Sequence, residues 1–410
     1  MLFAAAGISL VLLLAIAASL TGGLGPYLPA AESPAPEEGR DPAPDCDRWA
    51  SPSGDDTGSG RSETGAYRTV QKLVDSLPEG GTGCLEAGTY HGSDNYGTEL
   101  VLDRRRASEG ERITITSTPG ERATIEARII VRAGADFVTF RDLDLVGAPL
   151  FRDDGGEPIT VDGRERNTLP SPTVLADDTR WTGLDVTNNR QGESCFNLGL
   201  GEEYAERTNI SDSGIHDCGG FDINHDHGIY VSKANGTEIL NNRIYDNVDR
   251  GIQLYPDAND TLVRGNVIDG NGQGIIFSGR GTKVSRDNVV ENNLLTNSTR
   301  RSSGGTTYRG YNVDYHWEDL GPYGSPAIPP PEVPLSATGN VVRDNCISGG
   351  SEDEDPGAES GPGGIRPDPT GYVLESNVYQ DPAYVDREGR DLRLQPGSPC
   401  AGLLSGAEGR

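Results

Sequence analysis

Apolar residues in the middle of the chain occur in pairs five positions apart, usually with Asn or Asp between them or directly after. The pairs are Val138/Leu143, Trp181/Val186, Ile210/Ile215, Ile239/Ile244, Leu262/Val267, Val284/Val289 and Val341/Cys346. A second motif, Gly followed by Ile, begins at Gly228, Gly251 and Gly274 and recurs every 23 residues. A repeat of this length predicts two or three short strands joined by Gly, Asn and Asp turns.

One such repeat cannot bury its own apolar face, so we expect the copies to stack as coils of a β-solenoid with a rise of about 4.8 Å. The stacking predicts two inward columns of apolar side chains, Ile210/Ile239/Leu262/Val284/Val341 and Ile229/Ile252/Ile275. It also predicts one shared turn position, where stacked amides would hydrogen-bond along the axis. That position is occupied by Asn266, Asn288 and Asn345.

Four segments resemble the right-handed parallel β-helix proteins of the pectate-lyase-like superfamily, in particular secreted bacterial right-handed β-helix repeat proteins. They are YRTVQKLVDSLPEGGTGCLEAGTY (67–90), HDHGIYV (225–231), DRGIQLYPDANDTLVRGNVIDGNGQGIIFSG (249–279) and DPAYVDREGRDLRLQPGSPC (381–400). The resemblance implies an all-β, single-stranded right-handed parallel β-helix over residues 46–402, with a helix-containing N-terminal cap over 46–90 and a closing segment over 371–402. The superfamily includes lyases, hydrolases, epimerases and non-enzymatic surface proteins, so the resemblance specifies a fold and not an activity.

The N-terminal segments differ in composition from the repeat region. Residues 1–24 include a long apolar stretch that predicts a signal peptide or a membrane anchor, and the Pro-, Ala- and Glu-rich residues 25–45 predict a disordered stalk. Either reading predicts an extracellular domain, secreted or anchored by its N-terminal segment. Residues 299–338 and 351–370 predict loop excursions from the solenoid, the first of which, with Tyr311–Trp317, should fold back over its wall.

All six cysteines follow the predicted stalk, and export permits disulfides. The sequence alone does not fix their connectivity. A linear fold brings together only segments that are near in the chain, so we favour pairing in sequence order. The predicted disulfides are Cys46–Cys84, Cys195–Cys218 and Cys346–Cys400.

The charge of the chain restricts its partners. With 35 Lys and Arg against 63 Asp and Glu, the net charge is −28. Nucleic-acid binding needs a basic surface that displaces counterions, so we expect no nucleic-acid partner. The 56 glycines and 27 prolines argue against a helical bundle. We expect a monomer whose partner is a polysaccharide or a cell-surface glycan.

The strand after each repeated glycine predicts a binding wall. If the isoleucines point inward, Tyr230, Gln253 and Tyr255 point outward, with Asp257 and Arg280 beside the strands. Aromatic faces, amides and a few cations suit sugars and uronates. We therefore predict that these five residues bind substrate along one sheet of the solenoid.

Candidate catalytic groups lie close to the same strands. Removing the proton next to a uronate carboxylate needs a base and a positive group to hold the developing charge. His227 or Lys233 could be the base, with Arg250 or a bound Ca²⁺ as the stabiliser and Asp226 as the nearby carboxylate. Strict alternation would send His227 and Arg250 inward, whereas a glycine corner could turn them outward, so their direction stays open.

The densest polar cluster, residues 222–227, is an insertion in the repeat. Asp222, His225 and His227 could bind a metal together, although capping of the turn explains them as well. No cofactor follows firmly from the sequence, and Ca²⁺ is the one we consider.

Two classes of function stay open. The first is an extracellular protein that binds a polysaccharide and could cleave or epimerise it, as a lyase, C5-epimerase or glycoside hydrolase; a hydrolase would use paired carboxylates such as Asp226 and Asp249, or Asp222 and Asp257. The second is a non-catalytic surface or adhesion module. An enzyme should bring His225 or His227, Lys233 or Arg250, and a carboxylate within about 3–6 Å of one point.

Overall fold

The computed structural model describes residues 45–92, 99–103, 107–147, 160–161, 164–165, 170–220, 225–299, 301–303, 306–308, 310–318, 333–351, 361–366 and 371–404. The predicted signal or anchor over 1–24, and all of the predicted stalk except residue 45, lie outside these residues. Within the described part of the chain, no helix is both long and apolar enough to span a membrane.

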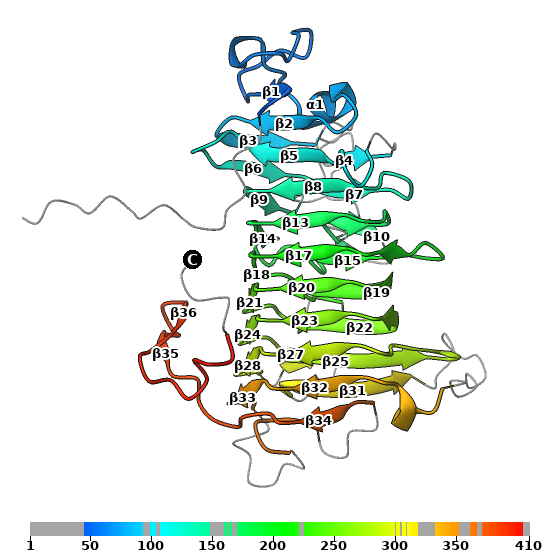
Figure 1. Ribbon diagram of the computed structural model, residues 1–410, viewed down its shortest axis with the longest axis vertical. Helices are drawn as coiled ribbons and strands as arrows, with labels where there is room; N and C mark the ends of the chain where they lie inside the picture. The colour runs from blue at the N-terminus through cyan, green and yellow to red at the C-terminus, as the bar shows by residue number, and fades with distance from the viewer. Residues whose placement is uncertain are drawn as a thin grey trace, which may run out of the picture. The chain divides into compact units, whose positions relative to one another are not determined.

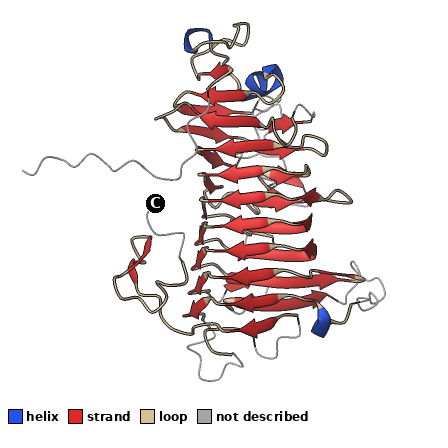
Figure 2. Cartoon of the chain, viewed as in Figure 1, coloured by secondary structure: helices blue, strands red, loops and turns tan. Residues whose placement is uncertain are grey.

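Short strands in this part of the chain build three parallel sheets, which we call A, B and C, around a common core (Figures 1 and 2). Each coil passes from sheet A through sheet B to sheet C and returns to sheet A one level further along. The chain folds as an all-β right-handed parallel β-helix, as the sequence predicts.

Sheet A contains, in spatial order, β1 (Arg48–Ala50), β2 (Thr82–Leu85), β5 (Ile113–Ser117), β8 (Val138–Arg141), β13 (Arg180–Thr182), β17 (Asn209–Ser211), β20 (Glu238–Leu240), β23 (Leu262–Arg264), β27 (Val289–Glu291), β32 (Val341–Arg343) and β34 (Val373–Glu375). Sheet B contains β3 (Gly88–His91), β6 (Ala123–Glu126), β9 (Leu143–Val146), β14 (Asp185–Thr187), β18 (Gly214–His216), β21 (Arg243–Tyr245), β24 (Val267–Asp269), β28 (Leu294–Thr296) and β33 (Cys346–Ser348). Sheet C contains β4 (Glu99–Leu102), β7 (Arg128–Val131), β12 (Thr173–Val174), β15 (Phe196–Leu198), β19 (Ile229–Asn235), β22 (Arg250–Asn259), β25 (Gln273–Arg280) and β31 (Val313–Glu318).

Smaller elements extend these sheets. On sheet C, β16 (Ala205–Glu206) pairs with β19, and β26 (Lys283–Val284) runs antiparallel to β25. The two-stranded antiparallel pairs are β10 (Thr160–Val161) with β11 (Arg164–Glu165), β29 (Arg301–Ser303) with β30 (Thr306–Tyr308), and β35 (Tyr384–Asp386) with β36 (Asp391–Leu394). The helices are α1 (Val70–Ser76) and the 3₁₀ turns η1 (Glu63–Gly65) and η2 (Leu335–Ala337).

The inward column on sheet C is the predicted one. Ile229 pairs with Ile252, which pairs with Ile275, and all three side chains are fully buried. On sheet A, Ile210 and Ile239 are also in register. The column then continues through Val263, Val290 and Val342, so the predicted members Leu262, Val284 and Val341 are wrong.

Stacked asparagines line the turns, as predicted. Between sheets A and B the ladder consists of Asn242, Asn266, Asn293, Asn345 and Asn377. Each side-chain amide donates to the side-chain oxygen of the next residue at 2.9 or 3.0 Å and so satisfies buried polar groups. Asn288 does not belong to this ladder, because it pairs with Asn340 at the turn between sheets C and A.

The N-terminal cap also agrees with the prediction. In α1, Val70, Leu73 and Val74 are buried, and the side chain of Thr69 accepts a hydrogen bond from the backbone N–H of Lys72 at 3.2 Å. The helix packs beside β1, β2 and β4, where it covers the first coil.

The first predicted excursion contains a complete strand of the solenoid. Val313–Glu318 forms β31, which pairs in parallel with β25 along sheet C and does not fold over the wall. Its neighbours at 319–332 lie outside the described residues, as does most of the second excursion, 351–370.

The part of the closing segment that follows β34 lies on the outside of sheet B. Tyr384, Leu392 and Leu404 pack with outward-facing Val267 and Leu294 in a second apolar cluster. The disulfides are Cys46–Cys84, Cys195–Cys218 and Cys346–Cys400, the pairing in sequence order, and the third joins the closing segment to β33.

Candidate functional site

Glycine corners turn His227 and Arg250 outward. A Cβ atom on Gly228 would lie 2.8 Å from the amide nitrogen of Asn247 and 3.1 Å from a methyl group of Ile244, so only glycine fits the inner side of this corner. The His227 ring then meets the outward Tyr230 ring edge-on, with ring centres 5.4 Å apart. The Arg250 Nη1 atom likewise lies 3.4 Å from the Oε1 atom of Gln253. The direction that the sequence left open is therefore the outer face of sheet C.

Asp249 holds these two residues together. Its Oδ2 atom lies 3.1 Å from His227 Nδ1 and 2.9 Å from Arg250 Nη1. The cluster is almost dry, since His227 and Asp249 are 0% exposed and Arg250 is 4% exposed. A guanidinium and an imidazole thus share one buried carboxylate.

This environment keeps the His227 ring neutral. The pKa of His227 is lowered to about 4, mainly by burial and to a smaller extent by the Arg250 charge, against the attraction of Asp249. In the tautomer that carries the proton on Nδ1, toward Asp249 at 3.1 Å, the lone pair on Nε2 is a proton acceptor. His227 is thus arranged as a base and not as an acid near neutral pH.

Several buried polar atoms at this place have no hydrogen-bond partner. Among the described residues, none makes a hydrogen bond of good geometry to either ring nitrogen of His227, to Arg250 Nε or to Gln273 Oε1. Such atoms are uncommon in folded proteins, and here they are gathered at one end of sheet C. They are groups that a bound ligand could satisfy.

A second buried carboxylate lies next to the cluster. Asp314, on β31, accepts hydrogen bonds from the Gln273 side chain and, at 3.1 Å, from Arg366 Nη1. Burial raises the pKa of Asp314, although the charge of Arg366 opposes the shift. The positive charge of Arg250 also acts on Asp314 and lowers its pKa slightly. Arg250 therefore interacts electrostatically with both Asp249 and Asp314.

An aromatic platform adjoins the charged cluster. Tyr230 and Tyr255 are partly exposed, and their rings lie nearly parallel at 15° with centres 6.4 Å apart. Gln253 pairs with Tyr230 across the two strands. The predicted residues Tyr230, Gln253 and Tyr255 therefore lie together on the outer face of sheet C.

The other predicted site residues lie at the far end of the strands. Lys233 is six residues after His227, about 20 Å along an extended strand. Its ammonium lies 3.2 Å from Glu202 Oε2 and over the Tyr204 ring, so the structure separates it from Arg250. It does not share the His227 cluster.

Asp257 is likewise occupied at that end. It bonds to Tyr204 and, at 2.7 Å, to Lys283 Nζ. Burial alone would raise the pKa of Asp257, but hydrogen bonds from Lys283 and Tyr204 lower it. Arg280 ends β25 nearby, opposite Glu318 of β31.

The predicted metal site receives no support from the described residues. Asp222 lies outside them, His225 is exposed, and His227 faces Asp249. No group of three or more His, Cys, Asp or Glu side chains in the described ranges could hold a metal ion. Ca²⁺ prefers a shell of oxygen ligands, whereas Asp249 already contacts a guanidinium, so we derive no step through Ca²⁺.

Asp226 lies beside this cluster. It is fully buried, and its backbone carbonyl accepts a hydrogen bond from the Asp249 N–H at 2.9 Å. The two aspartates proposed for a hydrolase therefore do occupy adjacent coils.

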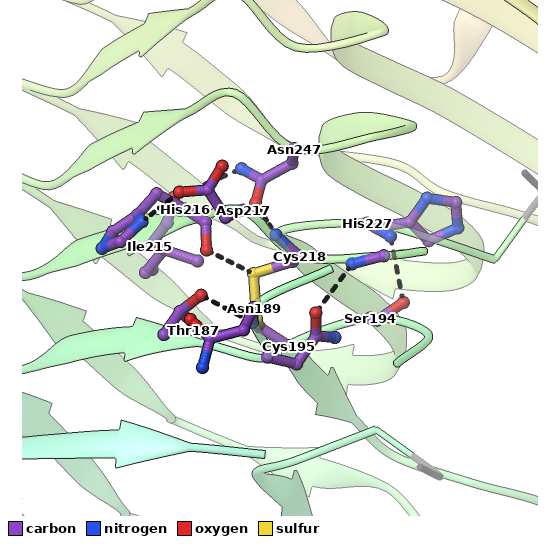
Figure 3. Close-up of a disulfide and its surroundings, with 12 residues drawn as sticks. Thr187, Asn189, Ser194, Cys195, Ile215, His216, Asp217, Cys218, His227 and Asn247 are labelled. Atoms are coloured by element: carbon purple, nitrogen blue, oxygen red, sulfur yellow. Dashed lines mark hydrogen bonds and ion pairs between the residues drawn. A yellow bond between two sulfur atoms is a disulfide. The ribbon is translucent and has the colours of Figure 1, made fainter. Parts of the chain in front are cut away.

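A disulfide supports the turn that carries His227 (Figure 3). Ser194 Oγ accepts the His227 backbone N–H at 3.3 Å, and the Cys195 N–H donates to the His227 carbonyl at 2.9 Å. At the other half-cystine, the Cys218 N–H donates to Asn247 of an asparagine ladder at 3.0 Å. The insertion between Cys218 and His227 is thus anchored at both ends.

Asp314 is the main addition to the predicted site. Asp249, which the sequence offers as a hydrolase carboxylate, is here the shared partner of His227 and Arg250. It precedes the Gly251 corner as Asp226 precedes Gly228, so the repeat itself predicts its position. Asp314 was missed because its strand was assigned to a loop excursion. The alternation of Val313, Asp314 and Tyr315 was the available signal.

The fold is shared with proteins of known structure. A family model described as "Right handed beta helix region" matches residues 177–313. The chain thus shares the right-handed β-helix fold that this model describes. A rhamnogalacturonan lyase structure is similar with 13% identity and a TM-score of 0.50, over 86% of this chain and 93% of that one. The pectate lyase Pel9A is similar with 13% identity and a TM-score of 0.48, over 86% and 90% of the two chains. No curated protein matches the sequence.

Proposed function

We propose that this β-helix is an extracellular protein that binds a polysaccharide along the outer face of sheet C. The observation that carries the proposal is the joint position of the Tyr230/Tyr255 platform and the buried His227–Asp249–Arg250 cluster. Parallel tyrosine rings offer flat apolar faces to sugar rings, and the adjoining amide and guanidinium groups can bond hydroxyls and carboxylates.

The printed name of the similar rhamnogalacturonan lyase agrees with a polysaccharide as the class of ligand. The disulfides and the apolar stretch in residues 1–24 support export. We propose that the protein acts as a monomer.

A second candidate function is proton abstraction from a uronate unit of the bound chain, favoured by the neutral imidazole beside a guanidinium. His227 Nε2 would take the proton on the carbon next to the carboxylate, and the electron pair would pass into the carboxylate as an enediolate stabilised by Arg250. Loss of the β-oxygen substituent then gives an unsaturated product, whereas reprotonation on the other face gives the epimer. The reaction requires His227 to become accessible, because its ring is fully buried in this structure.

A panel of neutral and acidic polysaccharides tests both functions. Binding is measured by titration calorimetry, and turnover by unsaturated uronates, new reducing ends and NMR signals of epimerised units. Binding without turnover supports the polysaccharide-binding protein and rejects the catalytic step. Arg250→Gln should abolish any turnover, and full activity in that variant would overturn the assignment of the site.

A further inference from the structure

A basic pocket lies on the outer face of sheet A, away from the sheet C site. It has a volume of about 350 Å³, within the range of about 300–1,000 Å³ typical of small-ligand sites. Residues of β13, β17 and β20 contribute to it, together with side chains that precede β5, β13 and β17. The lining residues are Arg112, Asp178, Arg180, Thr182, Arg207, Asn209, Ser211 and Glu238. Three arginines thus gather in one pocket of a protein with a net charge of −28.

Arg112 is held in place by neutral acceptors and forms no ion pair with a carboxylate among the described residues. Its Nε atom donates to Thr139 Oγ1 at 3.1 Å, and its Nη2 atom donates to the backbone carbonyls of Val138 and Asp178. Its guanidinium also lies 5.7 Å from the centre of the Phe137 ring. These contacts fix the position of the charge, which the nearby Asp178 carboxylate balances only in part because Asp178 also pairs with Arg207.

Arg180 adds a second positive charge that is not neutralised. It extends from sheet A between Thr139 and Asn209 of the neighbouring strands and is exposed. It forms no ion pair with any residue in the described ranges. Burial, and after it the proximity of Arg180, lowers the pKa of Arg112 to about 10, so the two guanidinium groups repel each other.

Each of the two acidic side chains that line the pocket has a hydrogen-bond partner within the lining. Both carboxylate oxygens of Asp178 accept hydrogen bonds from Arg207, at 2.8 and 2.9 Å. Glu238 Oε2 accepts from the Asn209 side chain at 3.0 Å. The floor between them is made of neutral groups, with Ser211 Oγ donating to Thr182 Oγ1 at 3.2 Å. An incoming anion would therefore meet the two guanidiniums of Arg112 and Arg180 and several hydroxyl and amide groups, with the Glu238 carboxylate at the edge of the lining opposing its binding.

We propose that this pocket binds the oxyanion of an acidic saccharide, a carboxylate or a sulfate group, with Arg112 and Arg180 as its cationic contacts. An oxyanion would relieve the repulsion between the guanidiniums and accept their charge-assisted hydrogen bonds. The saccharide part of the proposal rests on the proposed function, whereas the oxyanion part does not. The pocket would be a second contact site for the same chain or for another chain.

The test is calorimetric titration of the full protein and of three variants. The probes are sodium sulfate, tri-galacturonate and a sulfated disaccharide, which separate the bare anion, the carboxylate and the sulfate ester. Arg180→Gln removes one cationic contact, while Arg286→Gln makes the same change of charge at an exposed arginine outside the pocket. Tyr230→Ala alters only the sheet C site.

We expect Arg180→Gln to weaken binding of the oxyanion probes by about tenfold or more, the effect of one charge-assisted hydrogen bond. Arg286→Gln and Tyr230→Ala should leave this binding unchanged. Equal losses in Arg180→Gln and Arg286→Gln, or no binding of any probe by the natural protein, would overturn the proposal. A loss in Tyr230→Ala alone would place the anion on sheet C, which overturns the sheet A site and spares the proposed function. Sulfate binding that depends on Arg180, without saccharide binding, would support the oxyanion site and count against the proposed function.

Discussion

At the scale of single residues, burial decides the ionisation of His227 more than its carboxylate neighbour does. Asp249 would favour the imidazolium, but it already balances the charge of Arg250. A second positive charge in a fully buried cluster would have no counter-ion of its own. Because Asp249 already balances Arg250, the His227 ring stays neutral. The protonation state of this ring therefore affects both the chemistry of the site and the dependence of stability on pH.

Replacing His227 should therefore change how stability depends on pH. The native pKa of about 4 lies below the ordinary value of 6.5, so the unfolded chain gains the proton first as pH falls. The His227 contribution is complete above pH 6.5 and is lost as pH falls to about 4, by up to about 3 kcal/mol. Urea midpoints of the natural protein and of His227→Gln should converge over this interval. Parallel curves would show that the ring is not held neutral.

At the scale of the structural elements, the asparagine ladder maintains the stacking of the coils. The Asn293 amide donates to Asn345 and to the carbonyls of Val263 and Glu291, each at 2.9 Å, and its side-chain oxygen accepts from Asn266. Removal of such a side chain leaves several buried backbone groups without partners.

Asn293→Ala should lower the free energy of unfolding by about 2–4 kcal/mol, since more than one buried polar group loses its partner. Asn377→Ala is the matched control, because Asn377 ends the ladder and is only partly buried. We expect Asn377→Ala to lower the free energy of unfolding by at most half as much as Asn293→Ala. Chemical denaturation of both variants measures the difference, and equal losses would mean that the ladder interior has no special role.

The ladder and the core columns also show how far the sequence predicts this fold. The 23-residue spacing correctly predicts the coils and the Ile229 column. It fails by one residue at Leu262 and Val341, because both faces of those strands carry apolar residues and the period-two alternation disappears.

Part of that ambiguity comes from long-range packing. Val267 and Leu294 face outward yet are buried, because the closing segment covers them. No local pattern can indicate such a contact. For the same reason the candidate site was predicted as far as His227, Arg250 and Tyr230 but without Asp314, whose strand follows an insertion in the repeat.

At the scale of the whole β-helix domain, the closing segment is clamped onto sheet B by charge as well as by apolar packing. Arg387 lies 2.9 Å from Asp269, whose side chain is 3% exposed, and Arg390 bridges Asp217 and Asp246. Since Asp269 is almost fully buried, its carboxylate depends on Arg387 together with hydrogen bonds from Thr296 and Asn297.

Arg387→Gln should therefore loosen the closing segment selectively. Arg387 is 40% exposed, so we expect a modest cost of about 1–2 kcal/mol, seen as about tenfold faster amide exchange in residues 384–394. Arg393→Gln, on the same hairpin but 70% exposed, is the control and should leave exchange unchanged. Faster exchange throughout sheets A and C would contradict a local clamp.

Binding of a polysaccharide along sheet C is the central claim, and calorimetric titration of the Tyr230→Ala variant tests it most directly. The ligand is whichever polysaccharide of the panel the natural protein binds, and Tyr379→Ala, an exposed tyrosine outside sheet C, is the control. Removal of the Tyr230 ring, one of the two in the aromatic platform, should weaken binding about fivefold to tenfold, or about 1–1.5 kcal/mol, with no change in the control. No binding by the natural protein across the panel, or equal affinity in Tyr230→Ala, would contradict the account.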